Sequence, residues 1–376
     1  MPPRVALFTG NYNYVIDGVA LTMNRLVEYL ERVGVGVRVY APVAAKPVLE
    51  HSGTLFPVPS VPIVPPYRLA LGVTPAVKRD LHAFAPNIVH LATPDLLGFS
   101  ALRWARRRKI AAVTTYHTHF ASYLKFYRVG FLEGLAWRAH NWFYPHCAQT
   151  YVAAASMADE LRAHGVRANF VEAPFGVDPK QFHAGRRSAE WRRSQGVADD
   201  EVVVAFVGRL VWEKGLAVFA DVVNALKAGG VKFRALVVGD GPAAAGLRAK
   251  LPEAIYTGRV PHDAVATAFA SADVFLYPSA SETFGCVTVE ALASGPAVVV
   301  ADATGSRDIV RNGVDGVVCP AGDVPAFAAV VRRLIEDRAE RERLRAAGLE
   351  RAKAYEWDAV HARMVQNYRD VLGGRF

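Results

Sequence analysis

The chain has 376 residues, 52% of them hydrophobic, which predicts two medium-sized domains with substantial cores. No run of about 18 apolar residues is present, which argues against a spanning helix, and the start Met-Pro-Pro-Arg passes straight into an apolar run without a signal-peptide pattern. The three cysteines are far apart and offer neither a disulfide framework nor a zinc spacing. We therefore expect a cytosolic protein.

Short apolar runs alternate with helical periods along the chain, a pattern typical of parallel α/β units. In the first half we predict a helix over 21–33 and strands over 5–9, 35–41, 88–91, 112–116 and 149–153. In the second half we predict strands over 202–207, 234–238, 255–256, 274–277 and 297–301, and the last helices over 324–353 and 357–371. Between the two sets, the segment 172–182 contains Pro, Gly and Asp and is the expected linker.

Two carboxylates follow the predicted strand over 274–277. Glu282 lies in a turn, and Glu290 lies about two turns further on, in a helix expected to start near Val287. Gly285 precedes that helix, and a strand, a glycine-bearing turn and a helix N-terminus together suit a phosphate. Carboxylates beside such a site are better suited to accept hydrogen bonds from sugar or ribose hydroxyls. Either glutamate alone is better interpreted as a solvated residue, Glu282 in a loop and Glu290 on an exposed helix face, and only the neighbouring motifs favour a ligand role.

A second anion-binding arrangement follows the strand over 202–207. The strand ends in Gly208-Arg209, and Lys214 comes five residues later at the start of a helix. Arginine offers a bidentate fork and lysine a point charge, both usual partners of a diphosphate. The alternative interpretation is a pair of solvated charges next to a turn. Together with the two carboxylates, this arrangement predicts a nucleotide-sugar site.

A nicotinamide-binding domain is the competing interpretation, because Gly239 and Gly241 follow the strand over 234–238. Such a site needs an acidic residue at the end of the next strand to hold the ribose, and that strand ends in Thr-Gly-Arg. A dehydrogenase is therefore rejected. The chain has neither a Walker-type loop nor Asp-x-Asp, which argues against metal-dependent sugar transfer. His117 and His119 share a strand-end face, but no cysteine or carboxylate joins them in a zinc spacing.

Taken in chain order, several motifs resemble the retaining glycosyltransferases of the GT-B fold, in the large family 4 that includes bacterial lipid mannosyltransferases. The motifs are Gly208-Arg209 with Lys214-Gly215, Val238-Gly239-Asp240-Gly241-Pro242, Thr257-Gly258, and Glu282-Thr283-Phe284-Gly285 with Glu290. The segments 89–94, 116–120 and 175–182 resemble the same family, so the likeness covers nearly the whole chain. It implies an α/β protein with two Rossmann-like α/β/α domains facing a central cleft. The implied divisions are 1–172 for the acceptor, 173–355 for the nucleotide sugar, and 356–376 for a helix crossing back.

The resemblance also implies a metal-independent, cofactor-free transfer of a hexose from a nucleotide-diphosphate sugar with retention at the anomeric carbon. Arg209 and Lys214 would neutralise the leaving diphosphate, Glu282 would hold the sugar, Glu290 the ribose, and His117 would complete the catalytic set. The expected donor-binding residues are Gly18, Arg209, Lys214, Gly239, Arg259, Val260, Glu282, Thr283, Phe284, Gly285, Thr288 and Glu290.

Residues in the first half are assigned mainly to the acceptor. Tyr116, His117 and His119 follow a predicted strand at its carboxyl end, where ligands of open α/β sheets bind. In the family a histidine follows an aromatic residue here, which matches His117 better than His119. Asp17-Gly18 stands where the family has Gly-Gly or Asn-Gly. Gly18 lets the backbone approach a diphosphate, whereas Asp17, unfavourable beside phosphate, is assigned to the acceptor with Tyr116 and His119.

The net charge of +9 is uneven, since residues 1–178 carry 18 Lys and Arg against 11 Asp and Glu. Much of the excess lies in one cluster with a tryptophan among its members: Arg103, Arg106, Arg107, Arg108 and Lys109. Such a mixture suits the interface of an anionic membrane, and the alternative is a solvated helix. Nucleic acid would attract the same charge, but no nucleic-acid motif accompanies it.

The likeness is strongest to lipid mannosyltransferases that use GDP-mannose, and next to sulfoquinovosyl- and glucuronosyltransferases that act on diacylglycerol with UDP donors. We therefore expect hexose transfer, GDP-mannose favoured, to a lipid or glycolipid at the inner face of the cell membrane. The alternatives are a UDP-sugar-dependent enzyme of the second kind and, in another class, a nucleotide-sugar epimerase or a non-catalytic nucleotide-sugar-binding protein.

Overall fold

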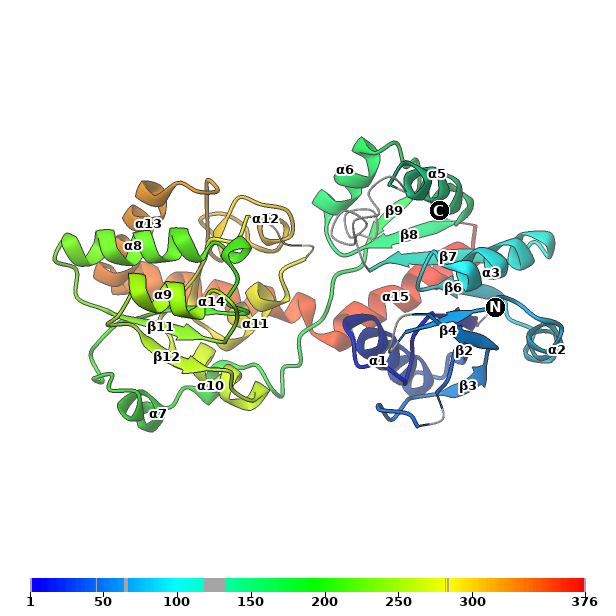
Figure 1. The fold of residues 1–376 in the computed structure, drawn as a ribbon, viewed down its shortest axis with the longest axis horizontal. Helices are drawn as coiled ribbons and strands as arrows, with labels where there is room; N and C mark the ends of the chain where they lie inside the picture. The colour runs from blue at the N-terminus through cyan, green and yellow to red at the C-terminus, as the bar shows by residue number, and fades with distance from the viewer. Residues whose placement is uncertain are drawn as a thin grey trace. The chain divides into compact units, whose positions relative to one another are not determined.

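A computed structural model describes residues 2–44, 46–63, 67–117, 133–280, 282 and 284–374, with residue 133 described for its backbone alone (Figure 1). Two predicted site residues, His119 and Thr283, lie outside these ranges. The chain divides into two compact units: unit 1 consists of Met1–Pro174 and Val360–Phe376, and unit 2 of Phe175–Ala359. Unit 1 is therefore built from two separate stretches of sequence.

Unit 1 is built around a parallel sheet with the strand order β3-β2-β1-β6-β7-β8-β9 in the described ranges. The strands are β1 (Arg4–Phe8), β2 (Gly36–Ala41), β3 (Thr54–Pro57), β6 (Ile88–Leu91), β7 (Ala111–Tyr116), β8 (Gln149–Val152) and β9 (Phe170–Glu172). A small antiparallel hairpin joins β4 (Ser60–Pro62) to β5 (Arg68–Ala70). The helices are α1 (Gly18–Arg32), α2 (Pro75–Phe84), α3 (Leu96–Arg107), α5 (Glu133–Phe143), α6 (Ala155–Ala163) and, from the C-terminal stretch, α15 (Trp357–Leu372), with the 3-10 turn η2 (Tyr144–His146).

Both faces of this sheet are covered, because alternate residues of each strand point to opposite faces. Ala6 and Phe8 of β1 belong to a core cluster with apolar residues of α2, α3 and α6. Val5 and Leu7 belong to a second cluster with residues of α1 and α15. The C-terminal helix thus supplies part of the core of the first sheet.

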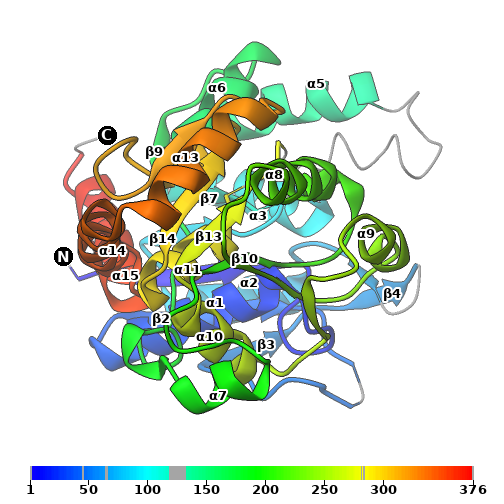
Figure 2. The same ribbon diagram turned by 90° about the vertical axis from the view of Figure 1, so that its left-hand side faces the viewer.

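Unit 2 has a parallel sheet with the strand order β12-β11-β10-β13-β14-β15. The strands are β10 (Val203–Val207), β11 (Arg234–Val238), β12 (Ile255–Gly258), β13 (Val274–Tyr277), β14 (Ala297–Ala301) and β15 (Val317–Cys319). The helices are α7 (Ala189–Ser194), α8 (Leu216–Ala228), α9 (Ala244–Lys250), α10 (His262–Ser271), α11 (Cys286–Ser294), α12 (Ser306–Ile309), α13 (Val324–Glu336) and α14 (Arg338–Ala352), with the 3-10 turns η3 (Ala184–Arg186), η4 (Trp212–Lys214) and η5 (Lys353–Tyr355). Helices α8 and α13 pack together on one side of the sheet, and α10, α11 and α14 lie on the other (Figure 2).

Most strands begin and end within one or two residues of the predicted positions, and two differences have physical causes. The predicted helix over 324–353 is wrong as one element: it breaks at Asp337, whose side chain accepts from the Glu340 N–H (2.9 Å) and caps a new helix. The short strands β3, β4, β5, β9 and β15 were not predicted. They are three or four residues long and lie at or next to the edges of their sheets, where alternation is hard to detect.

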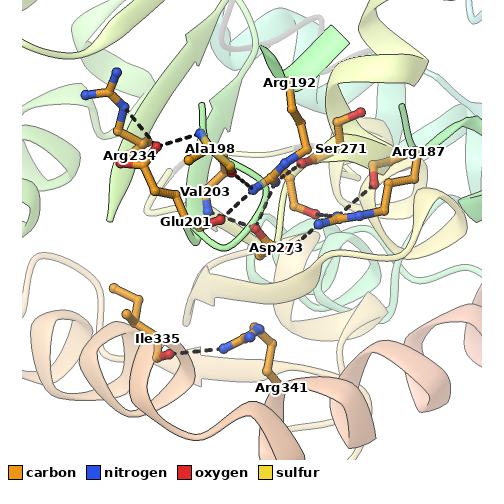
Figure 3. Close-up of polar contacts among 12 residues, drawn as sticks. Arg187, Arg192, Ala198, Glu201, Val203, Arg234, Ser271, Asp273, Ile335 and Arg341 are labelled. Carbon is orange, nitrogen blue, oxygen red and sulfur yellow. Dashed lines mark hydrogen bonds and ion pairs between the residues drawn. The ribbon is translucent and has the colours of Figure 1, made fainter. Parts of the chain in front are cut away.

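A buried ion-pair network supports unit 2 (Figure 3). Asp273, just before β13, accepts from Arg187 (2.8 Å) and from Arg192 of α7 (3.1 Å), and from the backbone N–H of Val203 (2.8 Å). The Arg192 side chain is 3% exposed and also donates to the carbonyl of Ser271 (2.8 Å). The network joins the segment that enters unit 2 to the centre of its sheet.

In the part of the chain that the structure describes, no helix is both long enough and apolar enough to span a bilayer.

Candidate functional site

The carboxyl ends of β10 and β11 meet through glycines. A Cβ atom on Gly239 would clash with the carbonyl oxygen of Gly208, and one on Gly241 with that of Leu210. Both Gly208 (φ 151°) and Gly239 (φ 130°) adopt conformations that side chains rarely allow. Close packing of the two loops is therefore a structural reason for these glycines.

Arg209 and Lys214 follow β10 at this edge. Arg209 is exposed, and its side chain forms no hydrogen bond or ion pair with any described residue. Lys214 ends η4, and Gly215 (φ 75°) then begins α8 against the backbone of Pro278, where a Cβ would clash. This close approach brings Lys214 to the loop after β13.

The Glu282 carboxylate is held through one of its two oxygens. Its Oε1 atom accepts from Lys214 Nζ (2.7 Å), from the Tyr277 hydroxyl (2.7 Å) and from Ser279 Oγ (2.9 Å). No described residue donates to Oε2. Burial and the nearby Glu282 raise the pKa of Tyr277, so that the phenol stays protonated and donates. The arrangement fixes the orientation of the carboxylate and leaves one oxygen for a further donor.

The N-terminus of α11 gathers groups that suit an anion. Gly285 (φ 97°) precedes the helix and offers no side-chain cap. A Cβ placed on it would lie 3.4 Å from Thr288 Oγ1 and 3.5 Å from Ser306 Oγ. Both hydroxyls are buried without a hydrogen-bond partner in the described ranges. Two hydroxyls beside the unpaired N–H groups of a helix start form an anion-binding arrangement.

Ser306 was not predicted as a site residue. It follows Gly305, which packs so closely on Phe284 that a Cβ would clash with the Phe284 carbonyl. A Gly-Ser pair just after the predicted strand over 297–301 was the available signal. Its meaning depends on β14 lying next to β13 in the sheet, which the sequence alone does not state.

Glu290 lies within α11 and is half-buried. It has no hydrogen bond or ion pair to a described residue, and burial raises its pKa to about 7. A carboxyl that is buried without a partner is costly in its ionised form, and a ligand hydroxyl that donates to it would offset that cost.

The remaining predicted donor residues include two at the end of β12 and one with a buried side chain. Arg259 and Val260 directly follow β12, next to Gly239, whose N–H donates to the Gly258 carbonyl (3.0 Å). The Phe284 side chain is buried against Phe175 and Tyr355, so only its backbone remains for a ligand.

In unit 1, Asp17 has a structural task that the sequence analysis did not assign. It caps α1: Oδ1 accepts from the Ala20 N–H (2.8 Å), and Oδ2 accepts from Asn11 Nδ2 (2.9 Å). A helix cap of this kind contributes about 1 kcal/mol. Gly18 begins the helix, and no described atom lies within 4 Å of a Cβ placed there. Asp17 therefore orients the start of α1, and the space beside the Gly18 Cα atom is not filled by described atoms.

At the end of β7, Tyr116 and His117 are differently placed. Tyr116 is buried and packs edge-on against His140 and Tyr144, so its ring belongs to the core. His117 is half-buried, and burial lowers its pKa to about 4, which leaves the imidazole neutral near pH 7. A neutral ring can both donate and accept hydrogen bonds. The cationic residues Arg103, Arg106, Arg107, Arg108 and Lys109 are exposed at the end of α3.

Comparison with known proteins agrees with this geometry. The profile described as "Glycosyl transferases group 1" matches residues 187–351, and "Glycosyltransferase Family 4" matches residues 16–181. The GDP-mannose-dependent alpha-mannosyltransferase of Corynebacterium glutamicum is 32% identical over 99% of this chain and 90% of its own length. The chain belongs to glycosyltransferase family 4. It is a glycosyltransferase.

Two further relatives of this glycosyltransferase carry, in their names, the same activity in one case and a different one in the other. A GDP-mannose-dependent alpha-mannosyltransferase of Mycolicibacterium smegmatis is 33% identical over 99% of this chain and 98% of its own. The sulfoquinovosyl transferase of Arabidopsis thaliana is 30% identical over 96% of this chain and 72% of its own. A further relative, the alpha-monoglucosyldiacylglycerol synthase of Acholeplasma laidlawii, is 26% identical over 84% of this chain and 84% of its own, so both mannosyltransferases and a glycolipid-forming transferase are among the relatives.

Solved structures support the fold. Sucrose-phosphate synthase from Thermosynechococcus elongatus superposes with a TM-score of 0.71 at 20% identity, covering 99% of this chain and all of that one. Anabaena HepE in complex with UDP-glucose gives 0.68 at 17% identity, covering 99% and 100%. The two parallel-sheet units of this glycosyltransferase are therefore those of the GT-B fold.

Proposed function

We propose that this glycosyltransferase moves a hexose, with GDP-mannose as the favoured donor, to a membrane lipid or glycolipid. The observation that carries the proposal is the Glu282 carboxylate, fixed by three donors with one oxygen open, beside Lys214 and the α11 N-terminus. A sugar diphosphate needs a carboxylate for its sugar hydroxyls and, beside it, cationic or N–H groups for its phosphates. The mannosyltransferase names of close relatives favour GDP-mannose among the donors.

The leaving diphosphate would be stabilised by Arg209, Lys214 and the start of α11. As charge grows on the leaving oxygen, groups already aimed at it lower the barrier most. Lys214 would exchange its contact with Glu282 for a phosphate oxygen. Tyr277 and Ser279 would then still hold Glu282 Oε1, so Oε2 keeps its direction toward the sugar hydroxyls. With these cations in place, we propose a transfer that needs no metal.

The nucleoside end of the donor would be held by Glu290. Ribose hydroxyls can donate to its carboxylate, and backbone groups near Gly258, Arg259 and Val260 would meet the base. Neutral His117 in unit 1 would contact the sugar or acceptor hydroxyls. We propose that the transfer retains the anomeric configuration, with the leaving phosphate assisting deprotonation of the acceptor.

A UDP-sugar donor is the second candidate, favoured by the Arabidopsis relative named as a sulfoquinovosyl transferase. A thermal-shift comparison of GDP with UDP, followed by transfer assays with GDP-mannose and UDP-sugars on a lipid extract, separates the two. We expect GDP to stabilise the protein more strongly and mannose to appear in the lipid fraction. Stronger stabilisation by UDP would overturn the mannose assignment.

We also propose that the enzyme works at the cytoplasmic face of the membrane as a peripheral protein. A lipid acceptor requires contact with a bilayer, and the cationic end of α3 in unit 1 offers charge for it.

A further inference from the structure

A hollow of about 630 Å³ lies between α2 and α3 in unit 1, and none of its lining residues is assigned above to the donor. Its lining combines cations with apolar groups and one hydroxyl: Val73, Lys78, Ser100, Arg103, Trp104, Arg107 and Arg108. Lys78 comes from α2, and the arginines come from the end of α3. Cations from two helices therefore converge on one cavity.

These cations lack compensating carboxylates. Residues 75–109 contain seven Lys and Arg but two Asp. Asp80 is bound to Arg38 (2.8 Å) and Tyr40 (2.8 Å), and Asp95 accepts from the Gly98 N–H (2.8 Å) at the far end of α3. Like charges gathered without a counter-charge repel one another, and a bound anion relieves that repulsion.

The wall of the hollow is fixed by contacts within unit 1. Arg108 is hydrogen-bonded to His82 of α2 (2.7 Å), and its guanidinium lies 5.2 Å from the centre of the Trp104 ring. The loop after β5 packs closely on α3, since the Val73 N–H donates to Ser100 Oγ (2.9 Å). An anion would therefore meet a preformed site.

The helix dipole explains only part of this charge. The C-terminal end of a helix carries roughly half a negative elementary charge, which favours cations in its last turn. That account covers Arg106 and Arg107, the basic residues of the last turn of α3. It does not cover Lys78 on another helix or Arg103 one turn earlier.

Exposed apolar side chains lie on the segments next to the lining residues Val73 and Ser100. Leu71 and Leu96 are each 57% exposed and flank Gly72, which packs against Ser100. The β4–β5 hairpin and its flanks also expose Val61, Ile63 and Tyr67. Leu96, Ser100, Arg103 and Arg107 share one face of α3, because they recur at helical spacing. That face changes from apolar to cationic along its length.

We propose that this surface docks on an anionic membrane and that its hollow binds the phosphate of a phospholipid headgroup. We call it the hairpin–α3 surface, formed by Val61, Ile63, Tyr67, Leu71, Leu96, Lys78, Arg103, Arg107 and Arg108. Arginine forks match phosphate oxygens, and the apolar side chains enter the acyl boundary beside them. The inference rests on the proposed function, because a lipid acceptor brings the enzyme to a bilayer.

The test compares two pairs of substitutions that remove the same charge. Lys78→Gln with Arg107→Gln removes two of the four cations that line the hollow, whereas Arg106→Gln with Lys109→Gln removes two neighbouring cations outside it. Binding is measured by flotation with vesicles of phosphatidylcholine alone and of phosphatidylcholine with phosphatidylglycerol in equal amounts. We expect the first pair to weaken binding to the anionic vesicles roughly 30-fold. The second pair should weaken it about threefold at most, because these exposed charges are screened by salt and do not contact the phosphate in the hollow.

An equal loss in both pairs would mean diffuse attraction and would overturn the site. A second comparison tests the apolar rim: Ile63→Ser with Leu71→Ser should weaken vesicle binding, whereas Val48→Ser with Val314→Ser, also exposed, should leave it unchanged. If inorganic phosphate stabilises the wild type but not the Lys78–Arg107 pair, and vesicles are not bound, the ligand is free phosphate and the lipid assignment is wrong.

Transfer to a detergent-dispersed acceptor is measured in the same variants. It should be unchanged by the Lys78–Arg107 pair, since neither residue belongs to the donor site. Failure of the proposed function would appear as absent transfer in every protein including the wild type, whatever the vesicles show.

Discussion

Arg209 and Lys214 make different contacts in the free protein, and this difference can be tested. Replacing either with Ala should lower turnover about 10²-fold or more, because a charge-assisted contact to the leaving diphosphate is lost. Arg209→Ala should leave the free energy of unfolding unchanged, since the side chain is exposed and contacts no described partner. Steady-state kinetics measures the turnover of each variant, and urea titration measures its free energy of unfolding. Near-normal turnover in either variant would mean that the diphosphate binds elsewhere.

Tyr277 is a positioning residue for Glu282, to which its hydroxyl donates (2.7 Å). Tyr277→Phe should lower kcat roughly tenfold while leaving the affinity for GDP intact, because bare GDP has no sugar for Glu282 to hold. Glu282→Gln should show the same split more strongly. Calorimetric titration measures the GDP affinity of each variant, and a transfer assay measures its kcat. A parallel loss of GDP affinity would contradict the assignment of Glu282 to the sugar.

Glu290 predicts a pH dependence of donor binding. Its pKa of about 7 in the free protein lies above the ordinary value of 4.5, so the carboxyl is largely protonated below pH 7. If the ribose needs the carboxylate, GDP affinity should rise about tenfold per pH unit up to pH 7 and level off above it.

Glu290→Gln provides the control, since it cannot ionise. GDP affinity in this variant should be lower at pH 8 and should not change with pH. The ligand-free variant should also be more stable than the wild type at pH 8. The pKa of Glu290 is raised on folding, so the wild type loses folding stability as pH rises from about 4.5 to 7, whereas an amide does not ionise and loses none. A wild-type profile that is flat between pH 6 and 8 would rule out the ribose contact.

At the scale of elements, neighbouring arginines of α7 make a matched pair. Arg192 is buried on Asp273, whereas Arg193 pairs with Asp199 at the surface, where both side chains are exposed. Arg192→Ala leaves the Asp273 carboxylate short of a buried partner and should cost about 3–5 kcal/mol in the unfolding of unit 2. Arg193→Ala should cost less than about 1 kcal/mol. Denaturant titration compares them, and similar losses would contradict a structural role for the network.

The elements of both cores could be predicted from the sequence because buried parallel strands are continuous apolar runs, as in Val203–Val207 and Ala297–Ala301. For the site, the sequence predicted which types of residue take part but not which of them contact one another. The contact between Lys214 and Glu282 joins residues 68 positions apart, and it exists because β10 and β13 are neighbours. Local spacing carries no information about such a pairing. For the same reason the contacts of Tyr277 and Ser306 were not predicted, nor was the helix cap that Asp17 provides.

At the scale of the whole molecule, α15 decides the integrity of unit 1. Met364, Val365, Tyr368 and Val371 are buried in its core, and the Tyr368 hydroxyl lies 2.6 Å from Nδ1 of His90 in β6. Burial lowers the pKa of His90 to about 3, so the ring stays neutral. Each buried side chain of this size contributes about 1.5–3 kcal/mol, and together they approach the whole stability of a domain.

Ending the chain at Ala359 should therefore unfold unit 1 while unit 2, which is continuous, keeps its fold. Heteronuclear NMR spectra or limited proteolysis of the shortened protein would show one ordered unit. Tyr368→Phe, which removes only the hydroxyl, should cost about 1–3 kcal/mol and keep both units folded. A shortened protein with both units intact would show that α15 is dispensable.

Because the chain returns to unit 1 at α15, the two units must complete their folding in a fixed order during synthesis. On the ribosome, the first 174 residues emerge without the helix that completes their core, and they wait while unit 2 is synthesised, roughly 10–40 s at ordinary rates. Unit 2 can fold as soon as its own last helix has emerged. The first half of the nascent chain thus finishes last and exposes an apolar sheet face until α15 has emerged, which makes it the part expected to need a chaperone. Stalling translation once residues up to Ala359 have left the ribosome, but before α15 has emerged, and pulsing with protease would reveal it, since the later-synthesised half should be protected and the earlier one cleaved.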